Sequence, residues 1–153
     1  MYRHHRLFCK TTLIAVAWMA LVISLCPVTK AVAADRLQVV SEKIFADTKK
    51  ELMWQTQTSK RLKSPKEVVA YLEKINKGQY SDWRLPTGVE LFTLTSIFDM
   101  KQNGAVKIRV EGKFWLSDQP GDYHVGSWEI GDGCGPSRSY YEGEAGYVRA
   151  VRP

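Results

Sequence analysis

The chain has 153 residues, of which 44% are hydrophobic and 11% aromatic, so it can build one domain with its own core and is not a disordered or low-complexity chain. Its formal net charge is +6, but four of its 22 cations lie in an N-terminal stretch without any acid, which leaves 18 cations against 16 acids. That near balance excludes nucleic acid as an expected partner.

The N-terminal residues 1–34 have the order of a secretory signal peptide. A basic stretch at 2–6 precedes an apolar stretch at 13–26, and small residues suited to cleavage follow at 31–34. An uncleaved anchor is the alternative, because the uncharged part approaches the roughly 20 residues that a membrane helix needs. In both cases we expect residues 35–153 to form a single extracytoplasmic domain, periplasmic or secreted, with membrane contact only through an uncleaved N-terminal segment.

The first part of the mature chain predicts a β-hairpin. Residues 37–46 form one β-prone run, four polar residues at 47–50 suit a turn, and residues 51–56 suit a returning strand. Trp54 is the natural inward anchor of this hairpin.

Two helix starts then follow with the same signals. At residues 64–67 (Ser-Pro-Lys-Glu), a hydroxyl cap, a proline and a carboxylate three residues after the cap predict a helix over 65–77, which Gly78 ends. At residues 87–90 (Thr-Gly-Val-Glu) a second capping box predicts a shorter helix over about 88–97.

After residue 105 the helix signals give way to short β-prone runs separated by turns rich in glycine and polar residues. The runs are 106–110, 113–117, 125–130 and 147–152, and the intervening loops include 118–122 and 131–136. Strands, then two helices, then strands predict an α+β fold with the two helices packed on short antiparallel strands.

Several motifs now support a resemblance to a known family. They are Trp54-Gln55, the stretch 82–87 (DWRLPT) followed by Glu90-Leu91, Phe114-Trp115-x-Ser117, and the terminal run 147–152 (YVRAVR). In this order they resemble the DUF1566 family, also called the Legionella collagen-like protein C-terminal (Lcl C-terminal) domain, over roughly residues 40–153.

The resemblance implies an exported domain of C-type-lectin-like architecture, in a family where adhesion or glycosaminoglycan binding is known for some members. The chain departs from the family pattern at three positions. Leu72 and Ala150 stand where cysteines are common, which suggests that packing replaces a covalent link, and Leu116 stands where a serine is usual.

The stretch 82–87 allows two interpretations. Asp82, Arg84 and Glu90 could form an acid/base constellation. Alternatively, Trp83 and Leu85 alternate with Asp82 and Arg84 as in an extended segment, so that the apolar pair faces the core while the charged residues bind the backbone or one another. We favour a structural motif, whose members are Trp54, Asp82, Trp83, Arg84, Pro86 and Glu90.

The region from 114 to 141 combines aromatic and polar residues that suit a sugar, whose C–H faces stack on rings while its hydroxyls bind acids and amides. The candidate ligand-binding residues are Trp115, Asp118, Asp122, Tyr123, Trp128, Arg138, Tyr140 and Tyr141. The alternative is that these rings are core. The aspartates match no tight calcium loop, so we expect neither a metal nor a cofactor.

These patterns predict a non-catalytic binding module for a glycan, a glycosaminoglycan or a cell-envelope protein. Cys134 is the one cysteine left after export, and it allows two alternative functions. One is a thiol-dependent enzyme with His124 as its base, and the other is a structural component of an envelope assembly in which Cys134 links two chains.

Overall fold

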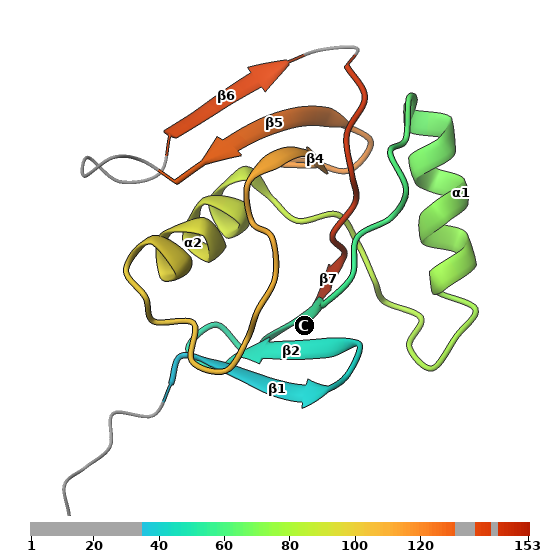
Figure 1. Ribbon diagram of the computed structural model, residues 1–153. Helices are drawn as coiled ribbons and strands as arrows, with labels where there is room; N and C mark the ends of the chain where they lie inside the picture. The colour runs from blue at the N-terminus through green and yellow to red at the C-terminus, as the bar shows by residue number, and fades with distance from the viewer. Residues whose placement is uncertain (1–34, 131–136, 142–143) are drawn as a thin grey trace, which may run out of the picture. The chain divides into compact units, whose positions relative to one another are not determined.

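Two small antiparallel sheets and two helices make up the described part of the chain (Figure 1). The computed structural model describes residues 35–130, 137–141 and 144–153. The elements, in chain order, are β1 (Leu37–Ser41), β2 (Ile44–Asp47), β3 (Leu52–Gln55), α1 (Pro65–Ile75), α2 (Gly88–Asp99), β4 (Gly112–Leu116), β5 (His124–Glu129), β6 (Ser137–Tyr141) and β7 (Val151–Arg152). The predicted α+β class is confirmed.

The first sheet has the strand order β1-β2-β3-β7, and the second has the order β4-β5-β6. The prediction of one continuous strand over 37–46 is wrong, because the chain reverses at Glu42-Lys43 and pairs Ser41 with Ile44. The turn after β2 is where the polar residues predict it. There the Asp47 carboxylate accepts a hydrogen bond from the Lys49 backbone N–H at 3.0 Å.

Both helices begin where the sequence predicts. In α2 the capping box is complete, since the Glu90 N–H donates to the Thr87 hydroxyl (3.1 Å) and the Thr87 N–H donates to the Glu90 carboxylate (2.8 Å). In α1 the Ser64 hydroxyl caps the helix, but the carboxylate of Glu67 accepts from the Lys63 N–H instead of the cap. Helix α1 ends at Ile75, two residues before the predicted end, and α2 ends at Asp99, two residues after it.

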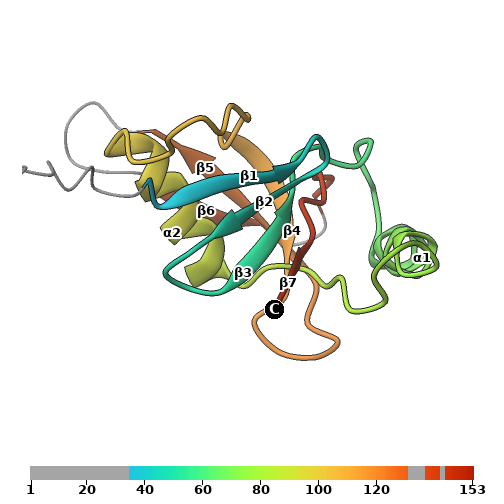
Figure 2. The same ribbon diagram turned by 90° about the horizontal axis from the view of Figure 1, so that it is seen from below.

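The interior consists of two hydrophobic clusters. One cluster joins the inner face of α2 to the first sheet, where the rings of Phe45 and Trp54 stack at 6.4 Å, and to Trp128 of β5. The other contains Val68 of α1, together with Trp83 and further residues of the C-terminal half. Figure 2 shows the consequence, with α1 seen end-on at one side of the molecule and α2 at the other.

Three expectations about the C-terminal half need correction. Residues 106–110 do not form a strand, because the Val106 N–H binds the Asn103 carbonyl and the Arg109 carbonyl binds a side chain. Of the predicted strand 147–152, only the residues of β7 form a regular strand. The run as a whole does not pair with one neighbour, since Tyr147 bridges to Phe114 and Val151 bridges to Arg84. Strand β6 was not predicted, and it pairs with β5 throughout.

The departures from the family pattern are consistent with this packing. Leu72 and Ala150, where the resemblance implies cysteines, both belong to the cluster around Val68, so apolar contacts hold these two positions. Leu116 is fully buried in the cluster around Trp54.

Candidate functional site

The stretch 82–87 is held to its neighbours mainly through its backbone. Arg84 and Val151 exchange two backbone hydrogen bonds of 2.9 and 3.0 Å. The side-chain amide of Asn76, at the end of α1, donates to the Trp83 carbonyl (2.9 Å) and accepts from the Trp83 N–H (2.8 Å). Trp83 and Leu85 are buried, as the alternation of the sequence predicts. The stretch therefore joins α1, α2 and the last strand.

The charged side chains of this stretch form two separate pairs. Arg84 donates two hydrogen bonds to the Glu90 carboxylate, at 2.9 and 2.7 Å, and a third to the Leu85 carbonyl. Asp82 accepts two from Arg152, at 2.6 and 2.9 Å. In each pair the guanidinium group is already bound to a carboxylate.

These contacts keep both carboxylates ionised. Burial raises the pKa of Glu90, but the hydrogen bonds from Arg84 and Thr87 outweigh it and hold that pKa below the ordinary range. The hydrogen bonds from Arg152 likewise lower the pKa of Asp82. Neither carboxylate is tuned to carry a proton near neutral pH, which a general acid requires.

The loop 117–123 is anchored on the start of α2. The Asp118 carboxylate accepts a hydrogen bond from the Gly88 N–H at 2.8 Å, and the Ser117 N–H donates to the Pro86 carbonyl at 3.0 Å. The His124 ring lies between two carboxylates, with its Nε2 3.5 Å from Asp118 and its Nδ1 3.4 Å from Asp122. The loop is thus fixed at both ends.

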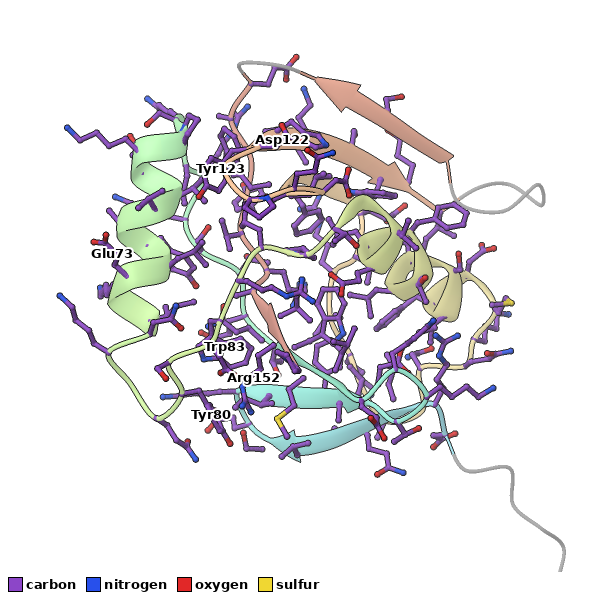
Figure 3. All side chains as sticks on the ribbon, turned by 180° about the vertical axis from the view of Figure 1, so that it is seen from behind. Glu73, Tyr80, Trp83, Asp122, Tyr123 and Arg152 are labelled. Atoms are coloured by element: carbon purple, nitrogen blue, oxygen red, sulfur yellow. The ribbon has the colours of Figure 1, made fainter. Side chains whose placement is uncertain are left out.

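A groove runs between α1 and this loop, and we call it the α1 groove. It consists of two hollows of about 430 Å³ each, which share Leu72, Arg84 and Tyr123. The first hollow extends from Glu73 of α1 along Asn76 and Lys77, which directly follow the helix, towards Trp83. The second extends along Asp118, Gln119 and Pro120 of the loop. Figure 3 labels Glu73 on α1, and Tyr123 and Trp83 on the segments beside it.

The α1 groove is lined both by residues predicted to bind a ligand and by a residue assigned to the structural motif. Asp118 and Tyr123, predicted to bind a ligand, line it beside Arg84 of the structural motif. Asp122 is exposed on the same loop. Trp115 and Trp128 are instead buried in the core, with exposed fractions of 2% and 0%, so neither ring offers a face on which a ligand could stack.

The remaining predicted residues lie elsewhere. Trp54 and Pro86 are buried, in line with their structural assignment. Arg138, Tyr140 and Tyr141 belong to β6, whose backbone pairs with β5, but their side chains lie outside the described residues. Cys134 is also outside them. The hypotheses that depend on these side chains stay predictions.

The groove residues in and just after α1 were missed from the sequence. They are Leu72 and Glu73 of the helix, and Asn76 and Lys77 beyond its end. Helical spacing gives no sign that a distant loop lies opposite them. The polar pair Glu73 and Lys77, four residues apart, was the available signal, and such pairs occur on any solvated helix.

The described residues contain no group of three or more histidine, cysteine or acidic side chains placed to hold a metal ion. Neither described helix combines the length and apolar character needed to cross a bilayer.

The fold and the groove define a small α+β domain with an open groove beside its first helix. The chain belongs to the Lcl C-terminal domain family, whose sequence profile matches residues 43–152. No curated protein and no solved structure is significantly similar to it. The relation to C-type lectins therefore stays a prediction.

Proposed function

We propose that this chain is a non-catalytic, extracytoplasmic binding module of the Lcl C-terminal type, and that it holds a glycan on a surface partner in the α1 groove. The signal-like order of residues 1–34 supports export. The observation that carries the proposal is the meeting of two hollows at the Tyr123 ring, between one polar helix face and one polar loop.

The groove has the chemistry that sugars require. Leu72, Pro120 and the half-buried Tyr123 ring supply apolar surface for the C–H face of a sugar. Asn76, Gln119 and other polar groups around the groove can exchange hydrogen bonds with hydroxyl groups. This combination favours a ligand that is polar at its edges and apolar on its faces.

The charges of the groove favour a neutral sugar over a highly sulfated chain. Arg84 is already bound to Glu90, so its charge is largely compensated. Of the other charged residues that line the groove, Lys77 is a cation while Glu73 and Asp118 are acids. A polysulfated glycosaminoglycan needs an excess of cations, which these residues do not supply.

The lowered pKa of Asp82 and of Glu90 argues against either carboxylate as a general acid, which fits a non-catalytic module. Both carboxylates already accept two hydrogen bonds from an arginine, and both serve to fix the junction between α1, α2 and β7. Their geometry is that of a structural support beneath a binding surface.

A glycan array probed with the purified protein tests the proposal, with a heparin column run against salt as the arm for sulfated chains. We expect retention by neutral glycans that persists in salt, and weak, salt-sensitive retention on heparin. If no glycan is retained, the proposal fails. If heparin is bound most tightly, the neutral-sugar assignment fails.

Variants then locate the site. Tyr123→Ala should weaken glycan binding about tenfold, whereas Tyr123→Phe should retain most of it, because the ring supplies the stacking surface. Glu73→Gln tests the helix side of the groove, and its matched control is Glu42→Gln, in the exposed turn after β1. Unchanged affinity in Tyr123→Ala would place the binding site elsewhere.

A further inference from the structure

A second cavity, of about 490 Å³, lies apart from the α1 groove and shares none of its lining residues. Its walls come from the residues just after β3, from the irregular segment before β4, from β4 itself and from the C-terminal run. The residues that matter below are Thr56, Arg109, Glu111, Phe114, Tyr147 and Arg149. We call it the Arg149 cavity.

Arg149 is the most deeply buried cation of the described chain, with an exposed fraction of 2%. Its Nη1 donates to the carbonyls of Gln55 (2.8 Å) and Thr56 (2.5 Å), and its Nη2 donates to the carbonyl of Arg109 (2.9 Å). A guanidinium group has five N–H donors. Two of them, on Nε and Nη2, make no hydrogen bond within the described residues.

Its partners distinguish Arg149 from the other arginines that form hydrogen bonds through their side chains. Arg36, Arg84 and Arg152 each bind a carboxylate. In the described part of the chain, Arg149 binds only carbonyl oxygens and lies 6.0 Å from the centre of the Phe114 ring. Carbonyls accept three hydrogen bonds from it, but they do not supply a negative charge.

The missing countercharge is costly. Burial lowers the pKa of Arg149 to about 10, and the one electrostatic contribution that opposes this comes from Tyr71. Buried charges in proteins are normally paired, because an uncompensated charge loses its hydration without an equivalent gain. A negative group entering the cavity would provide that gain.

We propose that the Arg149 cavity binds a single carboxylate group carried next to an apolar or ring-shaped face. Arg149 and the exposed Arg109 attract the anion, while Glu111 on the same wall limits the excess to one positive charge. The site therefore suits a monoanion better than a phosphate dianion. The two remaining N–H groups of Arg149 are equal in number to the two oxygens of a carboxylate, each of which can accept a hydrogen bond.

Two aromatic rings of the cavity would contact the part of the ligand next to its carboxylate. The rings of Phe114 and Tyr147 are 6.4 Å apart, and Tyr147 keeps 38% of its surface exposed. An exposed aromatic edge next to a buried cation suits a ligand whose charged end enters first and whose apolar part covers the ring. A peptide C-terminus and a uronic acid both present this chemistry.

Calorimetric titration of the full chain tests the proposal with two probes, hippurate for the peptide C-terminus and glucuronate for the acidic sugar. The matched controls are hippuramide and glucuronamide, which lack the charge. We expect at least one acid to bind at least tenfold more tightly than its amide, and the tighter acid identifies the source. If neither acid binds more tightly than its amide, or if sulfate competes as well as the acids, the proposal is wrong.

Variants place that binding in the cavity. Arg109→Gln should weaken the acid about threefold, because it removes an exposed charge but keeps the carbonyl that binds Arg149. Lys107→Gln, a matched control on the same segment, should not change the affinity. Arg149→Lys should weaken the acid about tenfold, since an ammonium group cannot bind both oxygens side by side.

Arg149→Lys also disturbs a buried position and can prevent folding. The decisive variant is then Tyr147→Ala, whose side chain is partly exposed. It should weaken binding of the acid that the wild type binds more tightly, while leaving the glycan affinity of the α1 groove unchanged. If that acid binds equally well to the wild type, Tyr147→Ala and Arg109→Gln, the proposal is overturned, and the outcome for the α1 groove is unaffected.

Discussion

Helices α1 and α2 begin with the same kind of capping signal but are used in different ways. Helix α2 buries five residues, among them Leu91, Leu94 and Ile97, whereas α1 buries only Val68. Figures 1 and 2 show them on opposite sides of the molecule. A helix that packs lightly leaves space along its inner side, and the α1 groove occupies that space. The capping signals therefore predict where a helix starts and say nothing about whether it supports the core or lines a site.

The largest expected difference between α1 and α2 is in the free energy of unfolding that is lost when a leucine of each helix is truncated. Leu94→Ala, in α2, should cost about 2 to 5 kcal/mol, because a buried leucine leaves a cavity that its neighbours only partly fill. Leu72→Ala, in α1, should cost clearly less, because Leu72 is only partly buried and lines the open groove. Urea denaturation measures both. Equal losses would show that α1 is as much a part of the core as α2.

The ion pair between Arg84 and Glu90 at the start of α2 should make the free energy of unfolding depend on pH. The pKa of Glu90 is lower in the folded chain than its ordinary value of 4.5. The unfolded chain therefore takes up the proton first as the pH falls. The stabilisation is complete above about pH 4.5 and is lost as the pH falls through the lower folded pKa.

Glu90→Gln should reduce the pH dependence of the unfolding free energy in this acidic range. Denaturation curves at several pH values below neutrality measure the effect. Glu42→Gln, in an exposed turn, is the matched control for the loss of one acidic side chain outside this ion pair. A Glu90→Gln protein with the wild-type dependence would mean that Arg84 does not stabilise the ionised carboxylate.

The N-caps of the two helices should differ less in their contribution to the free energy of unfolding. Thr87→Ala should cost about 1 kcal/mol, because the hydroxyl of Thr87 accepts from the Glu90 N–H in a complete capping box. Ser64→Ala should cost less, because its bond to the Glu67 N–H is longer, at 3.3 Å. Thermal unfolding of the two variants gives the comparison, and a larger loss for Ser64→Ala would contradict it.

The parts of the fold that the sequence predicted depend on local chemistry. The caps at Ser64 and Thr87, and the buried Trp54, follow from residues within one turn or one strand. The reversal at Glu42-Lys43 was missed because β-prone residues lie on both sides of it. Strand β6 was missed because its sequence, Ser-Arg-Ser-Tyr-Tyr, lacks a clear apolar alternation, and pairing with β5 supplies what its composition does not.

The candidate site was predictable only in part, for a similar reason. Asp118 and Tyr123 stood out as polar and aromatic residues in a loop. Their position opposite α1 follows from tertiary contacts, such as the bond from the Gly88 N–H to Asp118, across 30 positions of sequence. The burial of Arg149 likewise depends on carbonyls far from it in the chain. No local pattern encodes contacts of that range.

The most direct test of the α1 groove is an NMR titration of the ¹⁵N-labelled protein with the neutral glycan that the array retains best. Shift changes should concentrate on the backbone signals of Leu72, Asn76, Gln119 and Tyr123, while those of the β1–β2 turn stay unchanged. Shift changes confined to the first sheet or to the Arg149 cavity, with the α1 signals unmoved, would contradict the assignment of the α1 groove as the glycan site.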